Sequence, residues 1–176
     1  MKEIQRIETR RFFLRALNIS DVSNRYLGWL QGKMVRDHIV YARQPQTLQT
    51  LMDYVAAREG REDAVFLGIF SRSNGEHIGN IKYEPIDRIL RVAVMGILIG
   101  EREWQGKGVA AEVISGSALY MAQTCGIECL ELGVDSNHEF AIRAYTKLGF
   151  KPGPTAVIQP TKGSLGMVKY LRTVDV

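Results

Sequence analysis

The chain has 176 residues, of which 45% are hydrophobic and 24% charged; this is ordinary for a globular protein and enough for one domain, residues 1–176, with a substantial core. The formal net charge is +4, and because the densest basic group, residues 6–15, is interrupted by glutamate, we expect no nucleic-acid partner. The longest uncharged apolar stretch, residues 92–100, is too short to cross a bilayer, and residues 1–15 lack the apolar core of a signal peptide. We therefore expect a cytoplasmic protein without a membrane partner.

Capping residues and turn residues mark the elements of the first half of the chain. Ser20 and Asp21 are typical of a helix start, and Thr47 is typical of a second one. The Asn74-Gly75 dipeptide favours a tight turn between two strands. These signals predict a strand, two helices and a two-stranded hairpin over residues 12–16, 20–32, 47–60, 64–70 and 77–83.

Strands and helices alternate in the second half. Residues 91–99 are too apolar for an edge strand, and Gly96 inside them predicts a bulge or a close backbone approach. Gly126 and Gly149 each end a helix. The predicted elements are strand, helix, strand, helix and two closing strands over residues 91–99, 108–125, 129–134, 137–148, 150–158 and 166–171. The complete order is typical of a mixed α+β fold.

The two cysteines, Cys125 and Cys129, have no nearby histidine or further cysteine. The pair therefore lacks the ligands of a zinc site. We expect both thiols to be reduced and inert, and we expect no metal.

The segment 104–110 follows the apolar run 92–99 and predicts a glycine-rich turn that opens a helix. Such a turn presents backbone N–H groups at the positive end of the helix dipole, which suits a phosphate. Its spacing does not match the common ATP-binding or dinucleotide-binding motifs. We therefore expect an anionic cofactor that carries a pyrophosphate.

Two motifs, together with the element order, resemble the GNAT superfamily of acyl-CoA-dependent N-acetyltransferases. Residues 105–110 match that family's pyrophosphate pattern, Q/R-x-x-G-x-G/A, position for position. Residues 137–150 are similar to its pattern N-x-x-x-A-x-x-x-Y-x-x-x-G-F. The resemblance covers essentially the whole chain. Residues 98–101, with Trp104, also look like the subgroup of ribosomal-protein and aminosugar acetyltransferases.

The resemblance implies a mostly antiparallel sheet of about seven strands with about four helices. In that fold two parallel strands, here 91–99 and 129–134, splay apart and acetyl-CoA lies between them. The residues it implies for the cosubstrate are Ile97, Leu98, Ile99, Gln105, Gly106, Lys107, Gly108, Val109, Ala110, Asn137, Ala141 and Tyr145. Asn137 is equally suited to a helix N-cap, and both roles are compatible.

Acetyl transfer needs a neutral amine, a polarised thioester carbonyl and a proton for the departing thiolate. The resemblance implies that Tyr145 is the general acid and that a backbone N–H near Leu98 polarises the carbonyl. Many relatives carry glutamate as general base where this chain has Val94. The alternatives are a water chain or one of four side chains, and the base stays unassigned. Those side chains are Glu84, Asp87, Asp135 and His38.

The acceptor is expected to contact the loop after the first helix, where Met34, His38 and Tyr41 are the candidates. The leading hypothesis is acetylation of a primary amine on a small molecule, such as a nucleotide-linked aminosugar, by direct attack in a ternary complex. Acetylation of a protein N-terminus and a non-catalytic acyl-CoA-binding module are the alternatives. A homodimer is also kept open.

Overall fold

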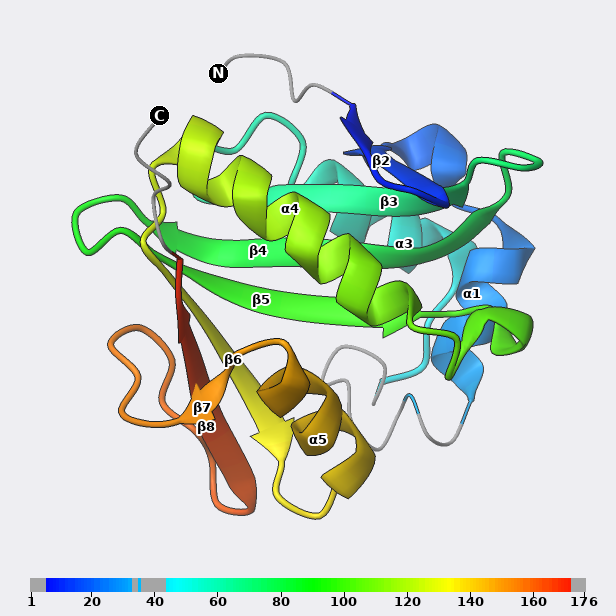
Figure 1. Cartoon of the computed structure of the whole chain (residues 1–176). Coiled ribbons are helices and arrows are strands. Elements are labelled where there is room, and N and C mark those ends of the chain that lie inside the picture. Colours follow the sequence, from blue (N-terminus) through cyan, green and yellow to red (C-terminus); the bar gives the residue numbers. More distant parts are fainter. Residues whose placement is uncertain (1–5, 33–34, 36–43, 172–176) are drawn as a thin grey trace.

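The computed structural model describes residues 6–32, 35 and 44–171 (Figure 1). Within them a sheet of eight strands forms in the order β1-β2-β3-β4-β5-β6-β8-β7. The strands are β1 Ile7–Glu8, β2 Phe12–Ala16, β3 Val65–Ser71, β4 His77–Asp87, β5 Val92–Ile99, β6 Cys129–Asp135, β7 Lys151–Pro152 and β8 Ser164–Tyr170. All neighbours are antiparallel except β5 and β6. The mixed, mostly antiparallel fold predicted from the sequence is confirmed.

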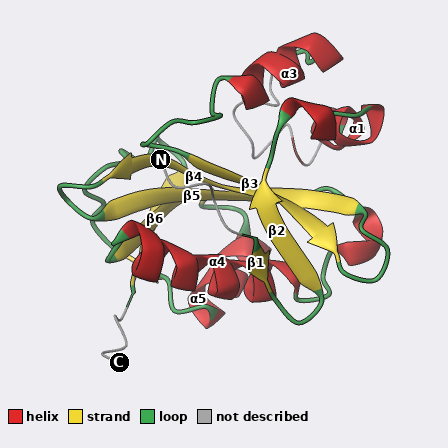
Figure 2. Cartoon of the chain, turned by 90° about the horizontal axis from the view of Figure 1, so that it is seen from above, coloured by secondary structure: helices red, strands yellow, loops and turns green. Residues whose placement is uncertain are grey.

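Helices cover both faces of the sheet (Figure 2). On one face lie α1 Asn24–Gln31 and α3 Leu48–Ala56, and on the other lie α4 Val109–Cys125 and α5 Glu139–Lys147. Short 3-10 turns, η1 Ile19–Asp21 and η3 Arg102–Trp104, precede α1 and α4. In the described ranges no helix combines the length and apolarity needed to cross a membrane.

The first helix starts differently from the sequence prediction. Asp21 closes a capping box with Asn18 in η1, and α1 starts later, where the Ser23 side chain accepts from Tyr26 N. The predicted cap at Ser20 and Asp21 was therefore wrong, because the local Asn18 turn uses those residues first. The second helix begins at the predicted cap, Thr47.

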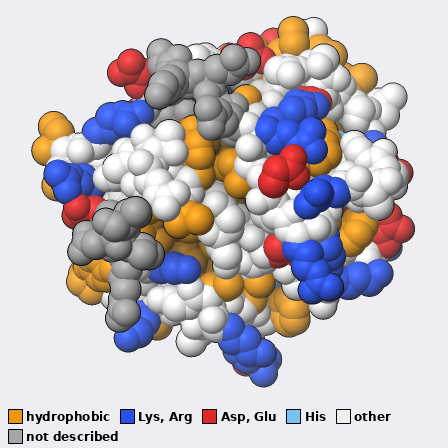
Figure 3. All heavy atoms as spheres, turned by 45° about the horizontal axis from the view of Figure 1, so that its top comes forward, with side chains coloured by type: hydrophobic (Ala, Val, Ile, Leu, Met, Phe, Trp, Pro, Cys, Tyr) orange, Lys and Arg blue, Asp and Glu red, His pale blue; other side chains and the backbone are white. Residues whose placement is uncertain are grey.

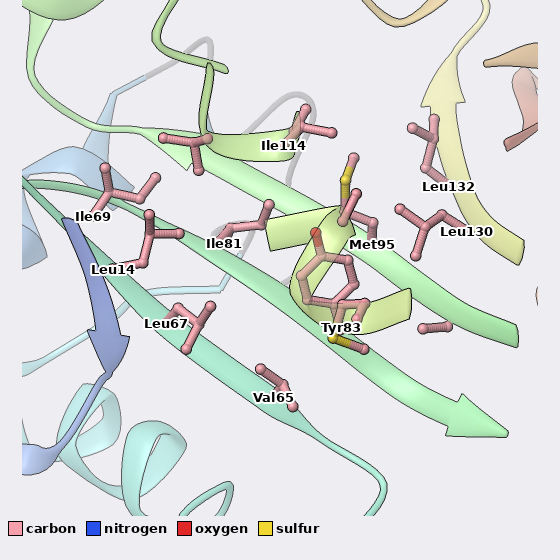
Figure 4. Packing of buried hydrophobic residues seen from close by; sticks show 14 of the residues in the cluster. Leu14, Val65, Leu67, Ile69, Ile81, Tyr83, Met95, Ile114, Leu130 and Leu132 are labelled. Carbon is pink, nitrogen blue, oxygen red and sulfur yellow. The ribbon is translucent and has the colours of Figure 1, made fainter. Parts of the chain in front are cut away.

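The larger core lies between α4 and the sheet, where apolar side chains of six strands converge on the helix; Figure 4 shows part of this packing. Ile81, Met95 and Ile114 are essentially enclosed there. Burying one such side chain stabilises the fold by about 1.5–3 kcal/mol. The buried Tyr83 hydroxyl lies 2.8 Å from Ser117 Oγ of α4, so its polar atom is satisfied. A smaller cluster packs α1 and α3 on the opposite face.

A fork between β5 and β6 is the feature that shapes the candidate site. The two strands pair through Val92–Cys129, Ala93–Leu130 and Val94–Glu131, and then diverge (Figure 1). Beyond this point β6 stays paired with β8, and β5 stays paired with β4. The C-terminal half of β5 therefore turns one backbone edge toward the fork.

Gly96 of β5 does not mark a bulge. The irregularity lies in β4, between Tyr83 and Ile86, and a Cβ at Gly96 would meet no atom within 4 Å. The close backbone approach is at Gly79, where a Cβ would lie 2.3 Å from Leu98 O. That prediction was wrong because strand composition does not reveal which partner strand carries the irregularity.

The first of the two closing strands is shorter than predicted, whereas the second, β8, starts two residues earlier than predicted. The predicted strand 150–158 is reduced to β7, because two prolines, at 152 and 154, lack the N–H that a ladder needs. The loop 153–163 instead folds onto the sheet at the paired glycines Gly133 and Gly166. A Cβ at Gly166 would lie 2.9 Å from Pro160, so the loop sits directly on the strand.

Candidate active site

A pocket of about 800 Å³ opens at the C-terminal end of β5. One wall comes from α1, the floor from residues 97–103 with Gln105, and the far side from the start of α5. Trp29, Leu98 and Phe140 represent the three sides. Phe140 lines the pocket and is 67% exposed.

The strand register decides which backbone groups of β5 face the fork. Gly100 N donates to Ile78 O at 2.9 Å, and hydrogen-bonding sides alternate along an antiparallel pair. The Leu98 N–H therefore faces β4, whereas the N–H groups of Ile97 and Ile99 face the fork. The expectation that the Leu98 N–H polarises a thioester is not supported by this register.

The predicted glycine turn connects the fork to α4. Gly106 and Gly108 have φ values of 71° and 73°, which glycine adopts without strain. Gly108 is the N-cap of α4 and offers no side-chain cap, so the first N–H groups of the helix are not satisfied by a cap side chain. Gln105 Nε2 donates to Ile99 O at 2.9 Å and ties the turn to β5. The Val109 side chain is buried in the core, so only its backbone could face a ligand at the turn.

The second motif is only partly on α5. Asn137 is exposed and precedes the helix, since His138 is the N-cap and Asn137 N donates to Asp135 Oδ1. Asn137 therefore lies outside the helix that carries Ala141 and Tyr145, whereas the sequence predicted one helix over residues 137–148. The structure brings Ala141 and Tyr145 against the main core.

Tyr145 packs edge-on against Phe150, with ring centroids 5.8 Å apart. Burial raises the pKa of its phenol to about 12, so the hydroxyl stays protonated at neutral pH. No hydrogen bond joins that hydroxyl to another described residue. Tyr145 does not line the pocket itself, and the α5 region reaches it through His138 and Phe140.

Glu84 of β4, the first of the candidate bases, is held in ion pairs. It pairs with Arg58, Arg61 and Lys82 at 2.7–2.8 Å. Burial alone would raise the pKa of Glu84, but the hydrogen bond and charge of Lys82 and the charge of Arg58 outweigh it and leave the pKa below its usual value. A carboxylate held this way is a poor proton acceptor.

Two other base candidates serve as turn residues. Asp87 Oδ1 accepts from the backbone of Ile89 and Leu90, and Asp135 Oδ1 accepts from Asn137. The remaining candidates of the acceptor loop, His38, Met34 and Tyr41, lie outside the described residues. In the described ranges no group of three His, Cys, Asp or Glu side chains could hold a metal ion. Both cysteines are free thiols.

Trp29 lines the pocket and also belongs to the smaller core cluster. Its indole Nε1 donates to Glu101 Oε1 at 2.8 Å, and Arg25 pairs with the same carboxylate. A Cβ at Gly100 would lie 1.9 Å from the indole ring, so the ring rests on bare backbone. The glycine directly after a central strand was the signal that could have pointed to this contact.

Glu131 is the other residue that the sequence did not single out. It is 1% exposed, and its carboxylate accepts the N–H groups of Ala156, Val157 and Ile158. Glu131 thus fixes the 153–163 loop beside the base of the fork. Nothing in its local pattern could reveal partners 25 or more positions away.

Charged side chains on the face shown in Figure 3 lie in separate groups, several of them containing both signs. They do not gather into one basic stripe there. The pocket itself includes paired charges, Arg25 with Glu101.

Comparison with known proteins identifies the relatives of this chain. Residues 11–151 match the family model described as "Acetyltransferase (GNAT) domain". No curated protein matches the chain. Among solved structures, a Vibrio cholerae spermidine N-acetyltransferase in complex with CoA and spermine is 18% identical with a TM-score of 0.78, over 91% of this chain and 95% of that one.

Two further structures concern ribosomal proteins. A ribosomal L7/L12 alpha-N-protein acetyltransferase in complex with coenzyme A has a TM-score of 0.81 and 15% identity, over 95% of this chain and 98% of that one. A Salmonella typhimurium acetyl transferase that modifies the N-terminal serine of L7/L12 has a TM-score of 0.80 and 15% identity, over 96% and 100%. At these identities the likeness shows the fold.

Proposed function

Because the chain belongs to the GNAT acetyltransferase family, we propose that it transfers an acetyl group from acetyl-CoA to a primary amine of a small molecule, such as a nucleotide-linked aminosugar. The carrying observation is the fork between β5 and β6, which opens beside both the pocket and the uncapped glycine turn. Along the chain the end of the β5–β6 pairing, the pocket floor and the glycine turn follow one another. We expect the thioester, the amide-bearing arm and the pyrophosphate of acetyl-CoA to follow in the same order.

The cosubstrate fits this arrangement. Gly106 leaves open space where a side chain would be, and the uncapped N–H groups that follow it suit a pyrophosphate. The fork-facing edge at Ile97 and Ile99 can pair with the amides of the pantetheine arm as an added strand would. Contacts from the turn and the opposite arm complete the proposed set: Gln105, Lys107, Gly108, Val109, Ala110, Asn137, Ala141 and Tyr145.

The reacting carbonyl is assigned to the Ile97 N–H. Ile99 is nearer to the glycine turn, and so nearer to the pyrophosphate, while Ile97 lies further along the fork toward the thioester. An N–H held in a strand is already oriented toward the developing negative charge, which favours attack. This assignment replaces the Leu98 N–H of the sequence prediction.

Attack by the neutral amine forms the amide bond and breaks the carbon–sulfur bond. The departing thiolate takes a proton, and Tyr145 is the proposed donor because its phenol is protonated at neutral pH. The proton that the nitrogen loses as the amide forms returns to the Tyr145 phenolate, so the step balances. An alkyl ammonium has a pKa of about 10 and must lose a proton first. Since Glu84, Asp87 and Asp135 are all engaged, we assign that proton to water in the pocket.

A second candidate acceptor is a protein N-terminus. It is favoured by the fold likeness to the ribosomal-protein enzymes, whose structures superpose over 95% or more of this chain. The exposed Phe140 at the pocket edge would suit a peptide beyond its first residue.

The test is thiol release from acetyl-CoA in the presence of three acceptor classes: aminosugar nucleotides, polyamines, and peptides with a free N-terminus. Amine-dependent release with the first class supports the proposal, and release with peptides alone supports the second candidate. Binding of acetyl-CoA in calorimetry without any release would leave an acyl-CoA-binding module instead. A Gly108→Trp variant is the control. Its side chain fills the turn, so it should neither bind acetyl-CoA nor release thiol.

A further inference from the structure

The N-terminal hairpin reaches across the molecule to the glycine turn. Arg11 lies in the turn between β1 and β2, and its Nη1 donates to Lys107 O at 3.1 Å, over a separation of 96 positions. Its Nη2 lies 3.9 Å from the position that a Cβ of Gly108 would occupy. A guanidinium is therefore held against the peptide unit that joins Lys107 to Gly108, the second of the two left-handed glycines.

Glu112, in the first turn of α4, holds that guanidinium in place. Its carboxylate accepts from Arg11 N at 2.6 Å, from Arg11 Nε at 2.7 Å and from Thr9 Oγ1 at 2.8 Å. The Glu112 side chain is only 17% exposed. Two groups of Arg11 bonded to one carboxylate fix both its backbone and its side chain, so the direction of the remaining N–H groups is set.

The contact has a consequence through the planar peptide bond. Lys107 C=O and Gly108 N–H belong to the same trans peptide unit and point in opposite directions. When Arg11 holds the carbonyl from behind, the Gly108 N–H must point to the open side of the turn. The charged donor also polarises the peptide, which strengthens that N–H as a donor.

We propose that Arg11, oriented by Glu112, is a positioning residue that presents the Gly108 N–H to the pyrophosphate of the cosubstrate. This inference rests on the proposed function, since it assumes that the turn binds the phosphates of CoA. Glycine turns have wide conformational freedom. The hydrogen bond from Arg11 restricts this freedom before the ligand binds, which lowers the entropy cost of binding. Arg11 acts through the Lys107 carbonyl and stands behind the turn.

The charge of Glu112 makes the inference sharply testable. A carboxylate in the first turn of α4 repels a phosphate bound at that helix end. If Glu112 acted only through its charge, Glu112→Gln would tighten CoA binding. If it orients Arg11, the same variant weakens CoA binding, so the two roles predict opposite signs.

The experiment measures CoA affinity by calorimetry in Arg11→Gln, Arg11→Lys, Glu112→Gln and wild type. We expect Arg11→Gln and Glu112→Gln to weaken CoA about tenfold, with Arg11→Lys between them and wild type. Arg10→Gln is the matched control, because Arg10 is the exposed neighbour of the same charge, and it should bind like wild type. Tighter binding in Glu112→Gln, or wild-type affinity in Arg11→Gln, overturns the inference.

A second readout separates positioning from general damage to the fold. The thioester S-acetylpantetheine lacks the pyrophosphate, so its kcat/KM should be the same in Arg11→Gln and in wild type, while the KM for acetyl-CoA rises. Equal losses with both thioesters would mean that the hairpin contact merely stabilises the fold, and would reject the inference. Failure of the proposed function is a different result, in which wild type itself does not bind CoA.

Discussion

Val94 of β5 and Glu131 of β6 are partners in the last pair before the two strands separate. Directly paired residues of neighbouring strands project from the same face of a sheet. The chain thus has valine at the position where the family resemblance led us to expect a glutamate as general base, and its buried carboxylate lies on the neighbouring strand. That carboxylate accepts three backbone N–H groups of the 153–163 loop, so its oxygen atoms hold the loop beside the fork.

Replacing Glu131 should therefore affect stability and acceptor binding together. Glu131→Gln leaves buried N–H groups without their acceptor, and we expect a loss of about 2–4 kcal/mol in unfolding free energy. The KM for the amine should rise while CoA affinity is unchanged, because the loop lies away from the glycine turn. Urea unfolding and steady-state kinetics measure both, with the exposed Glu128→Gln as control. An unchanged amine KM would remove the loop from the acceptor site.

Gly100 should tolerate no side chain. In Gly100→Ala the new methyl group would displace the Trp29 indole, and we expect a destabilisation of about 1–3 kcal/mol together with weaker CoA binding. Gly96→Ala, within the preceding strand β5, is the matched control, because its Cβ enters open space. Thermal unfolding and indole fluorescence report the change. Equal behaviour of the two variants would mean that the ring moves aside freely.

Tyr145→Phe should lower kcat without lowering stability. Its hydroxyl makes no hydrogen bond to another described residue, so the fold loses little, whereas a general acid contributes about a hundredfold or more to the rate. Tyr170→Phe, at a site 77% exposed, is the control. Stopped-flow measurement of thiol release separates the chemical step from product release. A Tyr145→Phe enzyme with the wild-type rate would require a different proton donor.

Stability should fall in acid through carboxylates whose pKa is lowered by cationic partners. Glu84 and Glu112 both have a depressed pKa in the folded state, so each stabilises the fold above its unfolded pKa of about 4.3. That contribution is lost as the pH falls through the lower, folded value. Urea unfolding between pH 3 and pH 7 should show a weaker pH dependence in Glu84→Gln than in wild type. Glu103→Gln, on the exposed surface, should retain the wild-type dependence.

Local signals predicted most of the fold. The Thr47 cap, the turn at Asn74-Gly75 and the two glycines that bound α4 each act within a few residues, so the sequence reveals them directly. The Asn18 turn was missed because two capping signals compete within six residues. The fork itself could be predicted only through resemblance, since nothing local tells β5 to leave β6 after Val94.

The candidate site was predicted less completely than the fold. The glycine turn carries its own conformational signature, and the structure shows it where the motif placed it. The contacts that orient it were missed, because Arg11 and Lys107 are brought together by tertiary packing over 96 positions. The same holds for Trp29 on Gly100, where a close approach depends on how α1 sits on the sheet.

The fork also protects an unpaired strand edge from pairing with the strands of other molecules. A strand with free N–H and C=O groups recruits strands of other molecules, and most proteins blunt or cover such edges. Here the unpaired backbone edge of β5 lies inside the fork, and the other side of the fork is formed by β6 paired with β8. A thin, flexible ligand can enter the fork and form hydrogen bonds with this edge of β5. The edge strand of another molecule belongs to a sheet that is too wide to fit. Divergence of two strands thus keeps one edge open to a small molecule and closed to aggregation.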